Sequence, residues 1–145
     1  MNSKIPSVPY VALELKSIEN PEFKVLIDNA LLDTGSCITL IPLGLLEEVE
    51  ARPTGSNEVI NGISGELIVR NYWTTVVFNG CEISLTARAW NGEVTIIGRD
   101  LINRYRIDFN GPNEKLTIHT GGDQSRSWLG RFLSTLFTLF SYLTI

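Results

Sequence analysis

The fold of this chain is decided by the stretch Leu31-Leu32-Asp33-Thr34-Gly35-Ser36. An apolar strand ends there in a carboxylate, and a small hydroxyl residue and a glycine follow at once, as in a tight turn. Asp-Thr-Gly occurs only once in the 145 residues. A carboxylate that activates water needs a neighbour to hold the second proton of the reaction. Two copies of the chain would therefore be needed to complete such a pair.

Composition limits the other chemistries that the chain can perform. The length of 145 residues suits one domain with a modest core, and the formal charge of −4 with a pI near 5.0 argues against a nucleic-acid partner. A single histidine and two cysteines offer no ligand cluster, so we expect no metal and no cofactor. Residues 1–10 lack the apolar run of a secretory signal, which predicts a cytoplasmic setting in which Cys37 and Cys81 are free thiols rather than a disulfide.

Short apolar runs separated by turn residues predict a compact all-β domain with one or two short helices. Asn-Gly pairs favour hairpin turns at Asn61-Gly62 and Asn79-Gly80. We expect strands at residues 8–16, 23–28, 30–32, 38–42, 72–78, 82–90, 94–97, 105–109 and 115–119, a Gly-rich hairpin over 58–69, and helical turns at 43–50 and 100–105. Trp73 and Trp90 are expected in the core.

The chain divides into a domain at residues 1–119, a polar Gly-Gly linker at 120–127 and an apolar tail at 128–145. Apolar residues of the tail recur at helical spacing, but Arg131 and several hydroxyl side chains interrupt them. Three outcomes stay open: a helix on a membrane surface, a short membrane anchor, or a helix packed on the body or on a second copy. Contact with a membrane is the favoured outcome.

Three blocks of the sequence resemble the retropepsins, the single-lobed aspartic proteases of retroviruses, and more closely their bacterial relatives. The blocks are residues 31–36, 60–65 and 94–101, and their order and approximate spacing match the family over residues 8–119. The resemblance implies a closed β-barrel-type lobe that forms a homodimer, with the two Asp-Thr-Gly loops meeting at the dimer axis. The C-terminal helix of residues 128–145 would be an addition to this fold.

The same resemblance implies a role for each matching residue. Asp33 becomes the catalytic carboxylate, Thr34 the side chain that grips the loop of the partner, and Gly35 the site where substrate backbone approaches closely. Residues 60–65 become the tip of a flap, with the Ile63 amide reaching the substrate through a water. The implied substrate-binding residues are Leu40, Ile60, Gly62, Ile63, Val94 and Ile96. They predict apolar side chains on both sides of the cleaved bond.

Ser36, Gly98 and Arg99 are expected to support the site rather than to react, and Ser36 departs from the retroviral pattern. Ser36 replaces the usual alanine, and a hydroxyl donated to the carboxylate would favour its charged form and a more acidic activity optimum. Cys37 and Ile38 replace two acidic residues, one of which normally pairs with the arginine that Arg99 resembles. Arg99 therefore needs another partner, either Asp100 or a carboxylate of the second subunit.

The sequence thus predicts an aspartic endopeptidase in which the paired Asp33 carboxylates of a homodimer activate water to hydrolyse a peptide or protein substrate. Two neighbouring carboxylates share one proton, so one acts as a base while the other acts as an acid. The alternative is a catalytically silent domain of the same fold that serves as a dimerisation or peptide-binding module.

Overall fold

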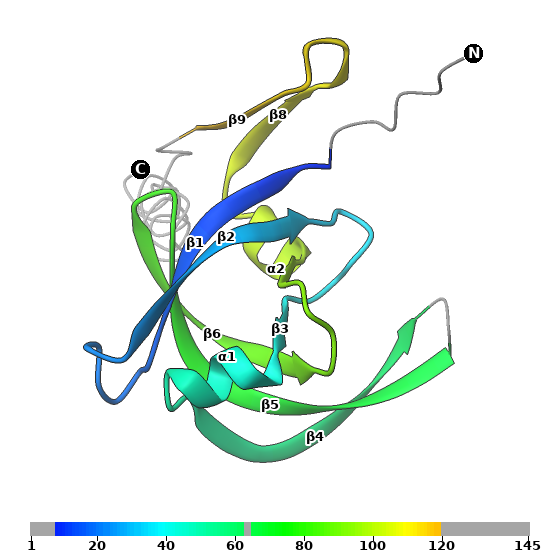
Figure 1. Ribbon diagram of the computed structural model, residues 1–145. Helices are drawn as coiled ribbons and strands as arrows, with labels where there is room; N and C mark the ends of the chain where they lie inside the picture. The colour runs from blue at the N-terminus through cyan, green and yellow to red at the C-terminus, as the bar shows by residue number, and fades with distance from the viewer. Residues whose placement is uncertain (1–7, 63–64, 120–145) are drawn as a thin grey trace, which may run out of the picture.

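The computed structural model describes residues 8–62 and 65–119, which form a closed barrel with a long hairpin and a separate two-stranded ladder (Figure 1). The strands of the main sheet are β1 (Tyr10–Lys16), β2 (Lys24–Leu32), β3 (Leu40–Pro42), β4 (Arg52–Gly62), β5 (Gly65–Phe78), β6 (Cys81–Trp90) and β7 (Ile96–Ile97). The remaining elements are α1 (Leu43–Glu48), α2 (Arg99–Ile102), β8 (Arg106–Asn110), a 3-10 turn at Gly111–Asn113, and β9 (Lys115–His119).

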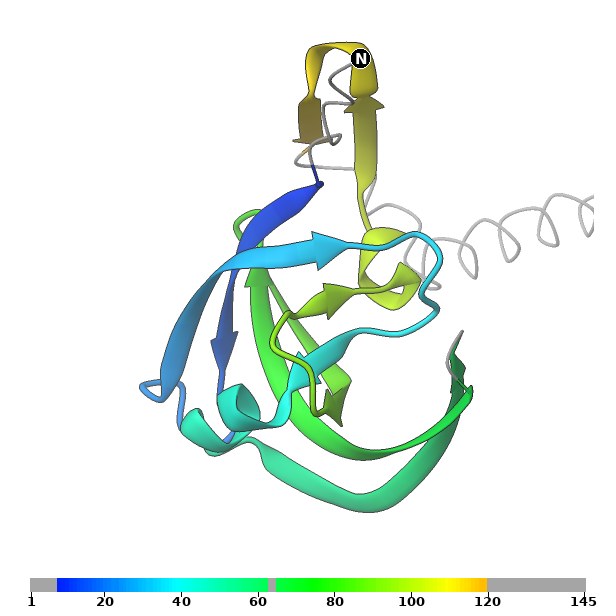
Figure 2. The same ribbon diagram turned by 45° about the vertical axis from the view of Figure 1, so that its right-hand side comes forward.

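The barrel closes because β5 is long enough to pair with both β4 and β1 along the same edge. The sheet order is β1-β2-β7-β3-β6-β5-β4, and an additional β1–β5 ladder joins the ends of the ring. The first part of the 14-residue β5 pairs with β4, and its last part, at residues 75–77, pairs with β1. Beyond the barrel, β4 and β5 continue together as a curved hairpin (Figure 2).

Alternating side chains fill the inside of this ring, as the period of a strand requires. The buried aliphatic and aromatic residues of the core include Leu13, Leu15, Ile27, Ala30, Ile41, Tyr72, Val76, Phe78, Ala87, Ile97 and Leu101. Tyr105, which follows α2, packs edge-on against Phe78 with ring centroids 5.0 Å apart and donates its hydroxyl to the Phe78 carbonyl at 2.9 Å. These contacts fix the position where β8 and β9 leave the barrel.

The predicted all-β fold with short helices is confirmed, and most of the expected strands are present within a few residues of their predicted bounds. Two local predictions are wrong. The hairpin predicted over residues 58–69 is present, but Asn61 and Gly62 do not form its turn, because they pair in the ladder with Glu66 and Gly65. Trp73 is 45% exposed because its neighbours Tyr72 and Thr74 take the buried positions of β5.

The predicted linker at residues 120–127 and the tail at 128–145 lie outside the described residues. Between residues 8 and 119, leaving aside 63–64, no helix has the length and apolar composition that crossing a bilayer requires.

Candidate active site

Asp33 lies directly after β2, where the main chain is held on both sides. The Leu32 N–H donates to the Pro9 carbonyl at 3.0 Å, and the Asp33 N–H donates to the Ile97 carbonyl of β7 at 3.0 Å. The turn then closes through the Ser36 N–H, which donates to the Asp33 carbonyl at 3.2 Å. Backbone hydrogen bonds to β7, to the residue before β1 and within the turn therefore fix the main chain at Asp33.

The carboxylate of Asp33 is oriented by its own turn. Its Oδ1 accepts the Gly35 N–H at 2.8 Å, which is the geometry of an Asx turn. A Cβ on Gly35 would lie 3.0 Å from the same oxygen, so a larger residue would crowd the carboxylate. Among the described residues, Oδ2 accepts no hydrogen bond. One oxygen is thus fixed by the loop while the other is free to meet a water or a second carboxylate.

Thr34 and Ser36 differ in how the loop uses their hydroxyl groups. Thr34 is exposed at the surface of the loop. The Ser36 hydroxyl donates to the Ile38 carbonyl at 2.7 Å. The expectation that Ser36 donates to the Asp33 carboxylate is therefore wrong for this chain, because the hydroxyl is satisfied within the backbone of its own loop.

A buried polar network lies beneath the loop and was not anticipated from the sequence. The Thr39 hydroxyl donates to Asp100 Oδ1 at 2.7 Å and accepts the Gly98 N–H at 3.2 Å. The Thr39 N–H donates to Asp100 Oδ2 at 3.0 Å. A polar residue within the apolar run from Ile38 to Pro42 was the available signal. The network joins the segment after the turn to the start of α2.

Gly98 lets these two segments approach each other. A Cβ at this position would lie 2.3 Å from the Ile38 main chain, so a side chain cannot be accommodated without displacing the loop. Gly98 itself is extended at the start of α2, and the Arg99 N–H donates to the Ser36 carbonyl at 3.0 Å. The expected supporting role of Gly98 thus has a steric basis.

Arg99 reaches a different partner from the one expected within the chain. Its Nη2 donates to the exposed Cys37 Sγ at 2.7 Å. Asp100 is occupied by Thr39, so it does not take the place of the missing acidic residue. Within the described residues, the guanidinium therefore contacts a soft sulfur acceptor next to the turn.

The predicted substrate-binding residues fall into two groups. Leu40 and Ile96 pair directly across β3 and β7, and Val94 precedes β7. Ile60 and Gly62 lie instead in β4, near the end of the hairpin. Both views place this end of the hairpin on the same side of the barrel as the loop after β2 (Figures 1 and 2). The prediction for Ile63 lies outside the described residues.

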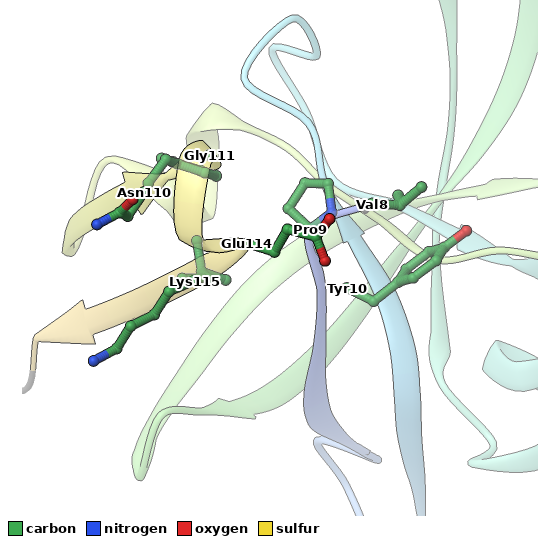
Figure 3. Close-up of a pocket in the computed structure, with 9 residues that line it drawn as sticks. Val8, Pro9, Tyr10, Asn110, Gly111, Glu114 and Lys115 are labelled. Carbon is green, nitrogen blue, oxygen red and sulfur yellow. The ribbon is translucent and has the colours of Figure 1, made fainter. Parts of the chain in front are cut away.

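A cavity of about 290 Å³ opens between the start of β1 and the β8–β9 hairpin (Figure 3). Val8, Pro9 and Tyr10 form one wall, and Phe109 and Leu116 belong to the other. Pro9 is also the residue that accepts the Leu32 N–H. The cavity contains none of the predicted catalytic or substrate-binding residues, so it is a separate feature of the surface.

Comparison with known proteins supports the fold. No protein-family model and no curated protein sequence matches the chain. Among solved structures, the chain is similar to EIAV protease complexed with the inhibitor HBY-793, with a TM-score of 0.53 and 19% sequence identity over 72% of this chain and 93% of that one. The closer resemblance to bacterial relatives stays a prediction. The fold of this protein is an all-β, retropepsin-like lobe.

Proposed function

We propose that this protein is an aspartic endopeptidase that acts as a homodimer. The observation that carries the proposal is the state of the Asp33 carboxylate, whose Oδ1 is fixed by the Gly35 N–H while Oδ2 accepts no hydrogen bond from the described residues. Among the described residues, only one Asp-Thr-Gly loop holds a carboxylate in this way. A second copy supplies the second carboxylate that acid–base hydrolysis of a peptide bond requires.

The chemistry follows from placing two such carboxylates side by side. Both cannot ionise at low cost, so the pair holds one proton over a mildly acidic range. The ionised Asp33 removes a proton from water as the water attacks the peptide carbonyl. The protonated Asp33 of the second copy donates a hydrogen bond to that carbonyl oxygen, and a proton then passes to the leaving amine. Thr34 lies exposed next to Asp33, where it contacts the equivalent loop of the second copy.

An apolar surface near the catalytic loop supports the dimer. Val8, Tyr10 and Phe109 are each about half exposed and surround the cavity between β1 and the β8–β9 hairpin. Exposed apolar groups gathered in one place favour contact with another protein surface. Because Pro9 binds the strand end before Asp33, a second copy docked here lies close to the carboxylate that it must complete.

Peptide cleavage by the full chain tests the proposal. Wild-type protein should cleave members of a peptide library between pH 4 and 6, and Asp33→Asn should abolish cleavage without altering the melting temperature. Asp28→Asn is the matched control, because Asp28 is an exposed carboxylate on β2, the strand that ends just before Asp33. Cleavage that survives in Asp33→Asn, or a folded wild-type protein that cleaves no peptide, would reject the enzyme. In the second case, peptide binding would support the silent module instead.

The dimer is tested separately by light scattering. Phe109→Lys should lower the dimer fraction and the cleavage rate together, because a charge is placed in the proposed contact. A monomeric wild-type protein with full cleavage activity would contradict the shared site.

A further inference from the structure

Arg88 belongs to a row of side chains that crosses five adjacent strands. The ladder registers pair Leu31 with Ile96, Ile96 with Leu40, Leu40 with Arg88, and Arg88 with Asn71. Residues directly opposite each other in neighbouring strands share one face of the sheet. Their neighbours along each strand supply the barrel core, so this row lies on the outer face. It leads from the strand before Asp33 to the strand that continues into the flap-like hairpin.

The guanidinium of Arg88 is only partly used in this row. Its Nε donates to Glu58 Oε2 at 3.0 Å, and its Nη1 donates to the Thr86 carbonyl at 2.8 Å. Among the described residues, its Nη2 donates to no acceptor. The Arg88 side chain is 20% exposed, which makes it accessible but less hydrated than a surface arginine. A positive group with an unused donor edge thus stands beside Leu40, one of the predicted substrate-binding residues.

The ion pair with Glu58 holds the Arg88 guanidinium between the barrel and the hairpin. Glu58 lies on β4 opposite Val69, two residues from Asn71 on β5, so it shares the face of the row. The ion pair therefore joins the hairpin to the barrel wall. A peptide bound between these two parts passes next to the Arg88–Glu58 pair.

We propose, resting on the endopeptidase function proposed above, that Arg88 determines specificity by binding an acidic side chain of the substrate. Neighbouring strands are about 4.8 Å apart, so Arg88 lies about 10 Å from Ile96 and about 14 Å from Leu31 along the row. An extended peptide advances about 3.3 Å per residue. The acidic residue is therefore expected about three or four positions from the cleaved bond.

A carboxylate fits this site better than any other side chain. The guanidinium of arginine is a cation with a planar set of donors, and a hydrogen bond between two charged groups is stronger than a neutral one. Glu58 already occupies Nε but leaves Nη2, so a substrate carboxylate either shares the guanidinium or displaces Glu58 from it. A substrate lysine or arginine at the same position meets an unfavourable positive charge. The site thus adds an acidic preference to the apolar pockets expected around Leu40 and Ile96.

Matched peptides measure this preference directly. The two peptides differ only by Glu or Gln at a position three or four residues from the cleaved bond. Their kcat/KM values should differ by at least about tenfold for the wild-type dimer at pH 6. Arg88→Leu should reduce the ratio to below about threefold while the Gln peptide is still cleaved. Arg88→Lys should keep part of the preference, and Glu58→Gln should increase it by removing the competing carboxylate. Arg70→Leu is the control, because Arg70 is an exposed arginine of β5 that pairs with Ala89 on the other face.

A binding arm separates this inference from the proposed function. Fluorescent versions of the two peptides are titrated against Asp33→Asn protein and the Arg88→Leu, Asp33→Asn double variant, with melting curves to show that both are folded. Tighter binding of the Glu peptide that is lost with Arg88 supports the subsite even if no peptide is cleaved. Equal affinity or equal cleavage of the two peptides, a preference that survives in Arg88→Leu, or no binding of either peptide overturns it. In the first two of these cases the endopeptidase can still stand.

Discussion

Replacing Thr39 by valine should destabilise the protein far more than the same change at two other fully buried threonines, Thr74 and Thr95. Valine has nearly the shape of threonine, so each substitution removes a hydroxyl without opening a cavity. The three hydroxyls differ in their partners. Thr39 binds a carboxylate and a backbone N–H, Thr74 donates to one carbonyl at 2.7 Å, and Thr95 has no partner among the described residues.

The magnitudes follow from these partners. A hydrogen bond to a charged group contributes about 1.5–3 kcal/mol, and a buried N–H left without a partner costs about 1–3 kcal/mol. Thr39→Val breaks the first and creates the second, so the free energy of unfolding should fall by about 3 kcal/mol. Thr74→Val loses one neutral hydrogen bond and should cost about 1 kcal/mol. Thr95→Val removes an unpaired buried hydroxyl and should be neutral or stabilising by up to about 1 kcal/mol.

Urea unfolding followed by tryptophan fluorescence measures all three variants under the same conditions. The slope of unfolding free energy against urea should stay constant, so that midpoints report stability alone. Thr39→Val should also lower the rate of the proposed peptide cleavage, because the network holds the segment that follows the Asp33 turn. If Thr95→Val destabilises as much as Thr39→Val, the hydrogen bonds are not the source of the difference, and the account of the network is refuted.

Four further substitutions, one of them a control, test three separate contacts. Gly98→Ala should cost about 3 kcal/mol or prevent folding, because its Cβ would clash with the Ile38 main chain. The control Gly44→Ala in α1 meets nothing within 4 Å and should stabilise the protein by about 0.5–1 kcal/mol. Thermal melts of both variants check this. Burial raises the pKa of Tyr105 from 10.0 to about 12, so its contribution to stability is complete below pH 10 and is lost as pH rises to 12. Tyr105→Phe should flatten that decline in stability curves recorded between pH 9 and 12, and an unchanged decline would contradict the assignment. Ser36→Ala should leave the pH optimum of cleavage unchanged while lowering stability by about 1 kcal/mol, since its hydroxyl donates to a backbone carbonyl; a shifted optimum would show that the hydroxyl reaches the carboxylate during catalysis.

Of the two hairpin turns predicted from Asn-Gly pairs, only the one whose flanking residues pair across the turn is present. Asn79 and Gly80 both have positive φ and connect the paired Phe78 and Cys81, as a two-residue hairpin turn requires. The same dipeptide at Asn61-Gly62 lies inside the ladder. The difference lies in the register between β4 and β5, which pairs Asn61 and Gly62 with Glu66 and Gly65.

The candidate site was predictable to a similar extent. The strand, the turn and the carboxylate of Asp33 follow from a few adjacent residues. The partners of Ser36, Arg99 and Asp100 do not, because they depend on how the segment after the turn packs against the start of α2, which lies far along the chain. Where several acceptors are available to a side chain, the one that it bonds is determined by the three-dimensional packing.

The closure of the barrel also determines when this site can form. The strand before Asp33 pairs with β7, and β1 pairs with the last part of β5, so the ladders around the turn join segments far apart in the chain. Contacts of this kind require large loops to close and make folding slow. As the chain leaves the ribosome, Asp33 emerges early but cannot be fixed in place until β7 and α2 have followed. A newly made chain therefore carries Asp33 on a segment that lacks its β7 and α2 partners until most of the described domain has been synthesised.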